Sequence, residues 1–95
     1  LNISIAAEIN RRLDGGLVNI KTYNISKVML AKASKFYKLL EPALNKEQKD
    51  ELSIAIRNCI QAIGNPGLFG VGAKPANEVV FKQNQQIALE VLKSL

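Results

Sequence analysis

Apolar side chains recur at intervals of three and four residues in four separate stretches of this chain, and that periodicity restricts the fold more than any other feature. Such an interval returns a side chain to the same face of an α-helix, so each stretch presents one apolar stripe. The expected helices span about residues 4–13, 25–40, 46–63 and 77–93. Each stripe must be buried against another, which predicts an all-α fold, a small four-helix bundle-like domain.

The first expected helix is followed by residues that typically end helices. Its apolar stripe consists of Ile5, Ala6, Ile9 and Leu13. We expect Asp14-Gly15-Gly16 to end this helix, because glycine readily adopts the left-handed conformation that closes helices. The next segment, residues 17–23, alternates imperfectly and contains β-branched residues. It has two interpretations, a short extended segment or the lead-in to the second helix.

The second expected helix, residues 25–40, is the clearest of the four. Asn24 is its expected N-cap, and Pro42 marks its end because a proline disfavours helical geometry in the residue before it. Its predicted apolar stripe consists of Ile25, Val28, Met29, Ala33, Phe36, Leu39 and Leu40.

The two remaining helices enclose a loop rich in glycine. Asn45 is the expected N-cap of the third helix, and Gly64 is expected to close it. The predicted stripe of the third helix is Leu52, Ala55, Ile56, Cys59, Ile60 and Ile63. That of the fourth is Val80, Phe81, Ala88, Val91 and Leu92, with Ile87 at its edge.

Length and composition indicate one domain over residues 1–95, since no linker divides the chain. A hydrophobic fraction of 47% and a charged fraction of 22% are typical of globular proteins. Charges interrupt every apolar stretch, so we expect no integral membrane association. The chain begins with Leu1 and lacks the layout of a signal peptide, so we expect that preceding residues were removed.

The residue types that carry most enzyme chemistry are scarce. The chain has no histidine, the commonest general base and zinc ligand. Glu47, Asp50 and Glu51 are expected to be solvated acids near a helix N-terminus, without the spacing of a calcium loop. Cys59 lies on an apolar stripe, which favours a small core residue over a reactive thiol, and a lone cysteine fits the cytoplasm. We therefore expect no enzyme activity, no cofactor and no metal site.

The loop between the last two helices is the first candidate binding site. Its glycines do not form a phosphate-binding loop, because Gly72 is followed by Ala73, Lys74 and Pro75 instead of a lysine and a hydroxyl residue. Its apolar residues have two interpretations. They seal the end of the bundle, or they form an exposed apolar tip that binds a partner. The protein-binding candidates are Leu68, Phe69 and Val71.

The second candidate site is basic. Residues 1–40 contain seven basic and two acidic side chains, a balance of +5, whereas residues 41–95 are balanced. A basic helix face can neutralise phosphates, and it can equally be a solvated surface. No arginine on the second helix supplies bidentate base contacts. The nucleic-acid-binding candidates are Arg11, Arg12, Lys27, Lys35 and Lys38.

Three functional hypotheses follow from these features. The first is a non-enzymatic helical protein that binds another protein, as an inhibitor, an immunity-type protein, or an assembly or regulatory factor. The alternative is a nucleic-acid-binding accessory protein that uses the basic face of the first two helices. The third is self-association, because four narrow stripes in a small chain can leave an apolar face for a symmetric partner.

Overall fold

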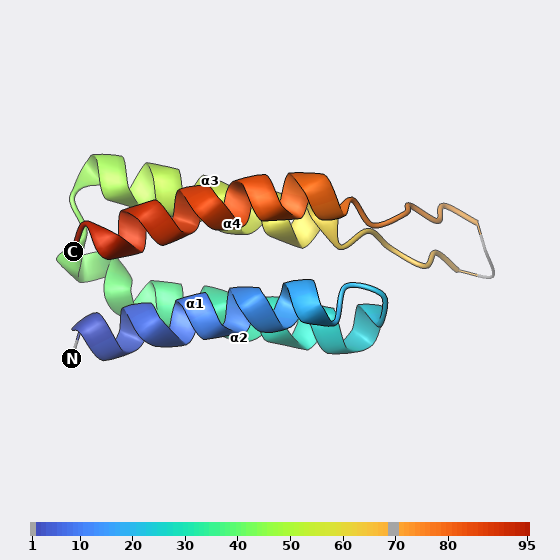
Figure 1. The fold of residues 1–95 in the computed structure, drawn as a ribbon, viewed down its shortest axis with the longest axis horizontal. Coiled ribbons are helices and arrows are strands. Elements are labelled where there is room, and N and C mark those ends of the chain that lie inside the picture. Colours follow the sequence, from blue (N-terminus) through green and yellow to red (C-terminus); the bar gives the residue numbers. More distant parts are fainter. Residues whose placement is uncertain (1, 69–70) are drawn as a thin grey trace.

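The computed structural model of this chain describes residues 2–68 and 71–95. The described part folds into four antiparallel α-helices and one short 3-10 helix (Figure 1). These elements are α1 (Asn2–Val18), α2 (Tyr23–Leu40), η1 (Glu41–Ala43), α3 (Lys46–Ala62) and α4 (Glu78–Lys93). The prediction of an all-α, bundle-like fold with a glycine-rich loop between the last two helices is confirmed.

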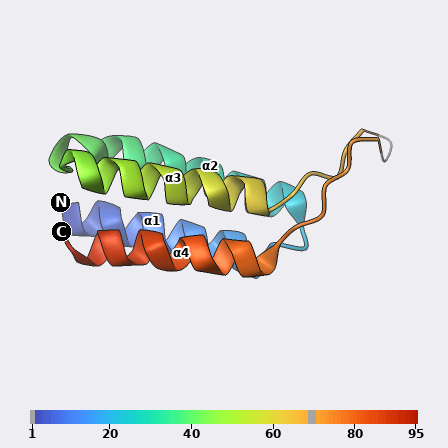
Figure 2. The same ribbon diagram turned by 90° about the horizontal axis from the view of Figure 1, so that it is seen from above.

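The helices form two layers, each an antiparallel pair. Figure 1 shows α1 beside α2 and α3 beside α4, and the view from above in Figure 2 places α4 next to α1 and α3 next to α2. Both ends of the chain lie at the end of the bundle where η1 connects α2 to α3. The turn after α1 and the loop after α3 lie together at the opposite end.

All four helices contribute to a single core. The largest of its completely buried apolar side chains are Ile9, Leu13, Leu30, Leu40, Leu52, Cys59 and Phe81. None of the helices that the structure describes combines the length and the apolar character needed to cross a bilayer.

The expected end of the first helix is wrong. α1 continues through Gly15 and Gly16 to Val18, and the segment that follows is a turn, not an extended segment. A Cβ atom on Gly16 would lie 2.7 Å from Leu30 Cδ2, so the missing side chain lets α1 approach α2 closely. Ser26, which is fully buried on α2, donates from Oγ to the Gly16 carbonyl oxygen at 2.8 Å. Gly16 therefore serves packing between α1 and α2.

The expected start of the second helix is also wrong. α2 begins at Tyr23, and its N-cap is Thr22, which makes no side-chain capping hydrogen bond. Asn24 instead lies inside the first turn. The end is as predicted, because α2 stops at Leu40 and Pro42 lies in η1.

The predicted stripe of α2 is partly wrong. Ile25, Val28 and Leu39 are 45%, 49% and 64% exposed. The buried residues of α2 are Ser26, Leu30, Ala33 and Leu40. α2 carries apolar side chains on two faces, and the close contact at Gly16 buries the face that holds Ser26 and Leu30.

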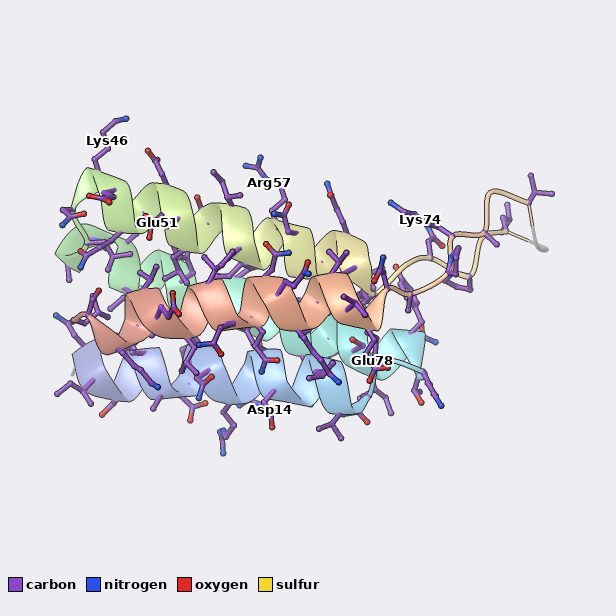
Figure 3. All side chains as sticks on the ribbon, turned by 45° about the horizontal axis from the view of Figure 1, so that its top comes forward. Asp14, Lys46, Glu51, Arg57, Lys74 and Glu78 are labelled. Carbon is purple, nitrogen blue, oxygen red and sulfur yellow. The ribbon has the colours of Figure 1, made fainter. Side chains whose placement is uncertain are left out.

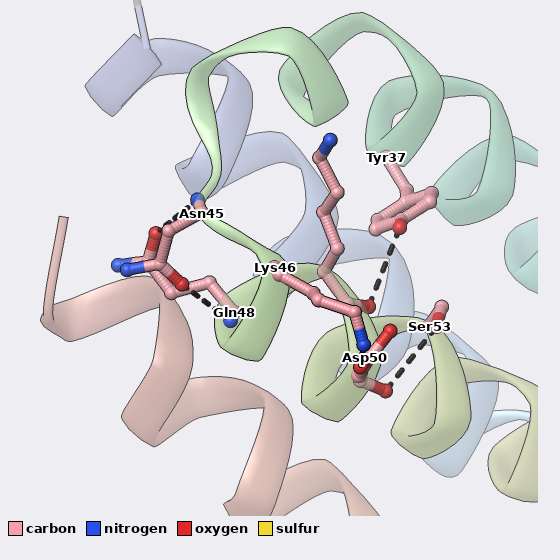
Figure 4. A network of polar contacts seen from close by, with 7 residues as sticks. Tyr37, Asn45, Lys46, Gln48, Asp50 and Ser53 are labelled. Atoms are coloured by element: carbon pink, nitrogen blue, oxygen red, sulfur yellow. Dashed lines mark hydrogen bonds and ion pairs between the residues drawn. The ribbon is translucent and has the colours of Figure 1, made fainter.

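The third helix begins where its predicted cap places it, and the fourth begins one residue after its expected start. Asn45 Oδ1 accepts from the Gln48 backbone N–H at 2.8 Å, and Gln48 Oε1 accepts from the Asn45 N–H at 3.0 Å (Figure 4). This reciprocal pair is a capping box. Asn77 caps α4 by accepting from the Val80 N–H at 3.0 Å. The predicted stripes of both helices are buried except at Ile60 and the edge residue Ile87, which are exposed, and Val80, which is half-buried.

Candidate functional site

The loop between α3 and α4 is closed at its base by backbone hydrogen bonds. Gly64 follows α3 with a φ of +73°, and a Cβ there would collide with the Lys74 carbonyl oxygen. Asn65 and Lys74 face each other and exchange two N–H to carbonyl bonds of 2.8 and 2.7 Å. Asn77 N–H donates to the Ala62 carbonyl at 2.7 Å. The loop therefore leaves and re-enters the bundle as a hairpin, described over residues 64–68 and 71–77.

The outer part of this hairpin is held by a second paired position. Leu68 and Val71 exchange two backbone hydrogen bonds of 3.1 and 2.9 Å. Gly67, with a φ of +76°, turns the chain toward this pair, and its N–H donates to Asn65 Oδ1 at 2.8 Å. Residues paired directly across two antiparallel segments place their side chains on the same face. Leu68 and Val71, the tip pair, therefore form one small aliphatic surface.

The hairpin projects from the bundle, and its tip pair faces solvent. Leu68 is 73% and Val71 is 77% exposed. The molecule measures 42 × 20 × 18 Å, whereas the 16 residues of α4 span about 24 Å, and much of the difference is the hairpin. Figure 3 shows Lys74 beyond the ends of α3 and α4.

The sealing interpretation of the loop is therefore wrong for the tip pair. The side chains buried at this end of the bundle are instead Ile20, in the turn after α1, and Ile63, which follows α3. The third candidate, Phe69, lies outside the described residues.

The basic candidates separate into two groups. On α1, Arg11 and Arg12 both reach one oxygen, Oε2 of Glu8, at 2.8 and 3.4 Å. That carboxylate compensates part of their charge. On α2, Lys27, Lys35 and Lys38 are exposed, and no α2 lysine makes an ion pair within residues 2–68 and 71–95. Among these five candidates, the positive charge without an ion pair in the described residues therefore lies on α2.

One of the α2 lysines is partly engaged by its own helix. Lys27 Nζ lies 5.9 Å from the centre of the Tyr23 ring, within the range of a cation–π contact. Lys35 and Lys38 have no such aromatic contact among the described residues. The solvent-facing aliphatic residues Ile25, Val28 and Leu39 lie on the same helix, and sequence reasoning missed them as surface residues.

Two ionisable side chains, Cys59 and Tyr37, have raised pKa values, which disfavour their reactive, deprotonated forms. Cys59 is completely buried, and burial raises the pKa of its thiol to about 12. Its Sγ donates to the Phe81 carbonyl at 3.7 Å. The core position predicted for Cys59 is confirmed. Burial, followed by the nearby Glu41 carboxylate, raises the pKa of Tyr37, whose hydroxyl donates to the Lys49 carbonyl at 3.4 Å.

No family model, curated protein or solved structure matches this chain. The candidate surfaces are therefore the hairpin tip and the outer face of α2, defined by their own geometry. Within the described ranges, no three His, Cys, Asp or Glu side chains are grouped as metal ligands.

Proposed function

We propose that this chain is a protein-binding helical domain, acting as an inhibitor, an immunity-type protein, or an assembly or regulatory factor. It inserts the hairpin tip into an apolar groove of another protein. The supporting observation is the exposure of Leu68 and Val71 at the end of a hairpin that projects from the bundle. Complete burial of an aliphatic side chain contributes about 1.5–3 kcal/mol, so a groove that covers both gains substantial affinity.

The backbone hydrogen bonds within the hairpin also favour binding. Four backbone hydrogen bonds join its two sides at the Asn65 and Lys74 pair and at the tip pair. A segment that is already held in shape loses less conformational freedom when it binds. A projecting, ordered pair of aliphatic side chains is therefore a favourable anchor for a concave partner.

Site-specific photo-crosslinking in the cells that make the protein tests this proposal. A photoreactive amino acid replaces Val71 in one variant and Val79 in the matched control. Val79 is 65% exposed but lies in the first turn of α4, away from the tip. We expect an adduct with a different chain from position 71, lost when Leu68→Ser is added, and no adduct from position 79. Absence of a position-71 adduct, or the same adduct from both positions, would contradict the proposal.

A second candidate function is nucleic-acid binding, supported by the exposed lysines of α2 that make no ion pair in the described part of the chain. Its test is binding to labelled duplex and single-stranded DNA and RNA over a salt series. This function predicts steeply salt-dependent binding that Lys27→Glu/Lys35→Glu/Lys38→Glu abolishes. Absence of binding at low salt would remove it and leave protein binding as the function.

A further inference from the structure

The solvent side of α2 carries a straight line of side chains. Its members follow one another at intervals of three, four, three and four residues, which keeps them on one line along a helix. These residues, the α2 stripe, are Ile25, Val28, Lys32, Lys35 and Leu39. All five are exposed, and the aliphatic members lie toward the two ends with the lysines between them.

The charge of the α2 stripe is not compensated within its own surroundings. No acidic residue occurs between Asp14 and Glu41 in the sequence. In the described residues, the ion pairs involve Glu8 on α1 and Asp50 on α3, and none reaches α2. Lys32 and Lys35 therefore present two free positive charges between aliphatic ends.

We infer that the α2 stripe docks one amphipathic helix of another protein, whose aliphatic side chains cover the stripe's ends and whose Glu or Asp side chains pair with Lys32 and Lys35. The alternating three-four interval is the one at which two helices pack along each other at a shallow angle. The partner helix must carry negative charge opposite the two lysines. This requirement fixes where along the α2 stripe it binds and excludes helices without acidic residues at those positions. This surface is separate from the hairpin tip and does not depend on it.

The same charges disfavour a second copy of this chain as the occupant. Lys32 is the midpoint of the stripe between Ile25 and Leu39. If two α2 stripes packed symmetrically, in either direction, lysines would face lysines at the centre of the contact. Like charges brought together at an interface oppose association. A bilayer surface also fits less well, because the aliphatic residues form a narrow line instead of the broad apolar face that inserts into lipid.

A synthetic peptide helix of about 18 residues, or five turns, is the probe. It carries leucine opposite the aliphatic ends of the α2 stripe and glutamate opposite Lys32 and Lys35. Fluorescence anisotropy with the whole chain should show saturable 1:1 binding. Lys32→Glu/Lys35→Glu should weaken this binding by about tenfold or more, and a peptide with lysine in place of glutamate should restore it.

The matched control carries the same change of charge on another helix. Lys82→Glu/Lys93→Glu alters two exposed lysines of α4, and it should bind the acidic peptide as the unchanged protein does. Circular dichroism establishes that each variant is folded. The inference would be overturned by absence of saturable binding, by equal loss in the α4 control, by failure of the lysine peptide to rescue, or by preference for phosphatidylserine vesicles over the peptide.

Discussion

At the scale of single residues, the contact of Gly16 with Leu30 and Phe81 fixes how closely α1 lies against α2. A Cβ on Gly16 would lie 2.7 Å from Leu30 Cδ2 and 3.3 Å from Phe81 Cζ, and both of these side chains are buried. Its neighbour Gly15 is different, because the closest atom to a new Cβ is Met29 Sδ at 3.2 Å. Methionine is flexible and can move aside.

The two glycines should therefore respond in opposite directions to alanine. Replacing a helical glycine by alanine gains about 1 kcal/mol of helix propensity, whereas overpacking a core costs about 1–3 kcal/mol. Gly15→Ala should raise the free energy of unfolding by up to about 1 kcal/mol, and Gly16→Ala should lower it by up to about 2 kcal/mol. Urea unfolding followed by circular dichroism measures both. Equal stability of the two variants would contradict the packing role of Gly16.

The raised pKa of the Cys59 thiol predicts how the free energy of unfolding changes at alkaline pH. Burial raises the pKa of its thiol from 9.0 to about 12, so between these values the unfolded chain releases a proton that the folded chain keeps. The contribution of the protonated Cys59 thiol to the free energy of unfolding is complete below pH 9. Above pH 9 this contribution is lost by up to about 1.4 kcal/mol per pH unit. Unfolding titrations of the protein and of Cys59→Ala should show a steeper alkaline decline with the cysteine present. Parallel declines would contradict this assignment.

These residues differ in how far the sequence predicts them. The core position of Cys59 follows from its place on an apolar stripe, which is a local pattern. A glycine pair is compatible with a helix end and with close packing, and local sequence does not distinguish the two. What decides between them is contact with Leu30 and Phe81, which are distant in sequence.

At the scale of elements, the helix caps differ in what they contribute. Asn45 accepts from the Gln48 N–H and completes a capping box, whereas Thr22 at the start of α2 makes no side-chain capping bond. Asn45→Ala should therefore lower the free energy of unfolding by about 1 kcal/mol. Thr22→Ala is the matched control and should change it by less than about 0.5 kcal/mol. A comparable loss in both variants, measured by thermal and urea unfolding, would contradict the role of the capping box.

The same contrast explains which helices the sequence predicts well. α3 and α4 each have an asparagine cap and a predicted stripe that is mostly buried, so their starts and most of their buried faces follow from local chemistry, although Ile60 on α3 and Ile87 on α4 are exposed. α2 has aliphatic residues on two sides, and periodicity alone does not choose between them. Tertiary contact with α1 buries Ser26 and Leu30 and leaves Val28 on the surface.

At the scale of the whole molecule, the tip pair and the α2 stripe are two of the places where aliphatic side chains of the described residues face solvent. The tip pair lies at the end of the hairpin, and the α2 stripe runs along one side of the bundle. The sequence identifies the loop that holds Leu68 and Val71 but not their exposure. Exposure depends on the pairing of Asn65 with Lys74 and on the positive φ of Gly64 and Gly67, which turn the loop away from the core.

The central claim is that the tip pair belongs to a binding surface and not to the core, and the free energy of unfolding of Leu68→Ser/Val71→Ser tests it most directly. Because both side chains face solvent, their removal should change that free energy by less than about 0.5 kcal/mol. A loss of about 2 kcal/mol or more, as expected when buried aliphatic side chains are truncated, would place the tip pair in the core and contradict the claim.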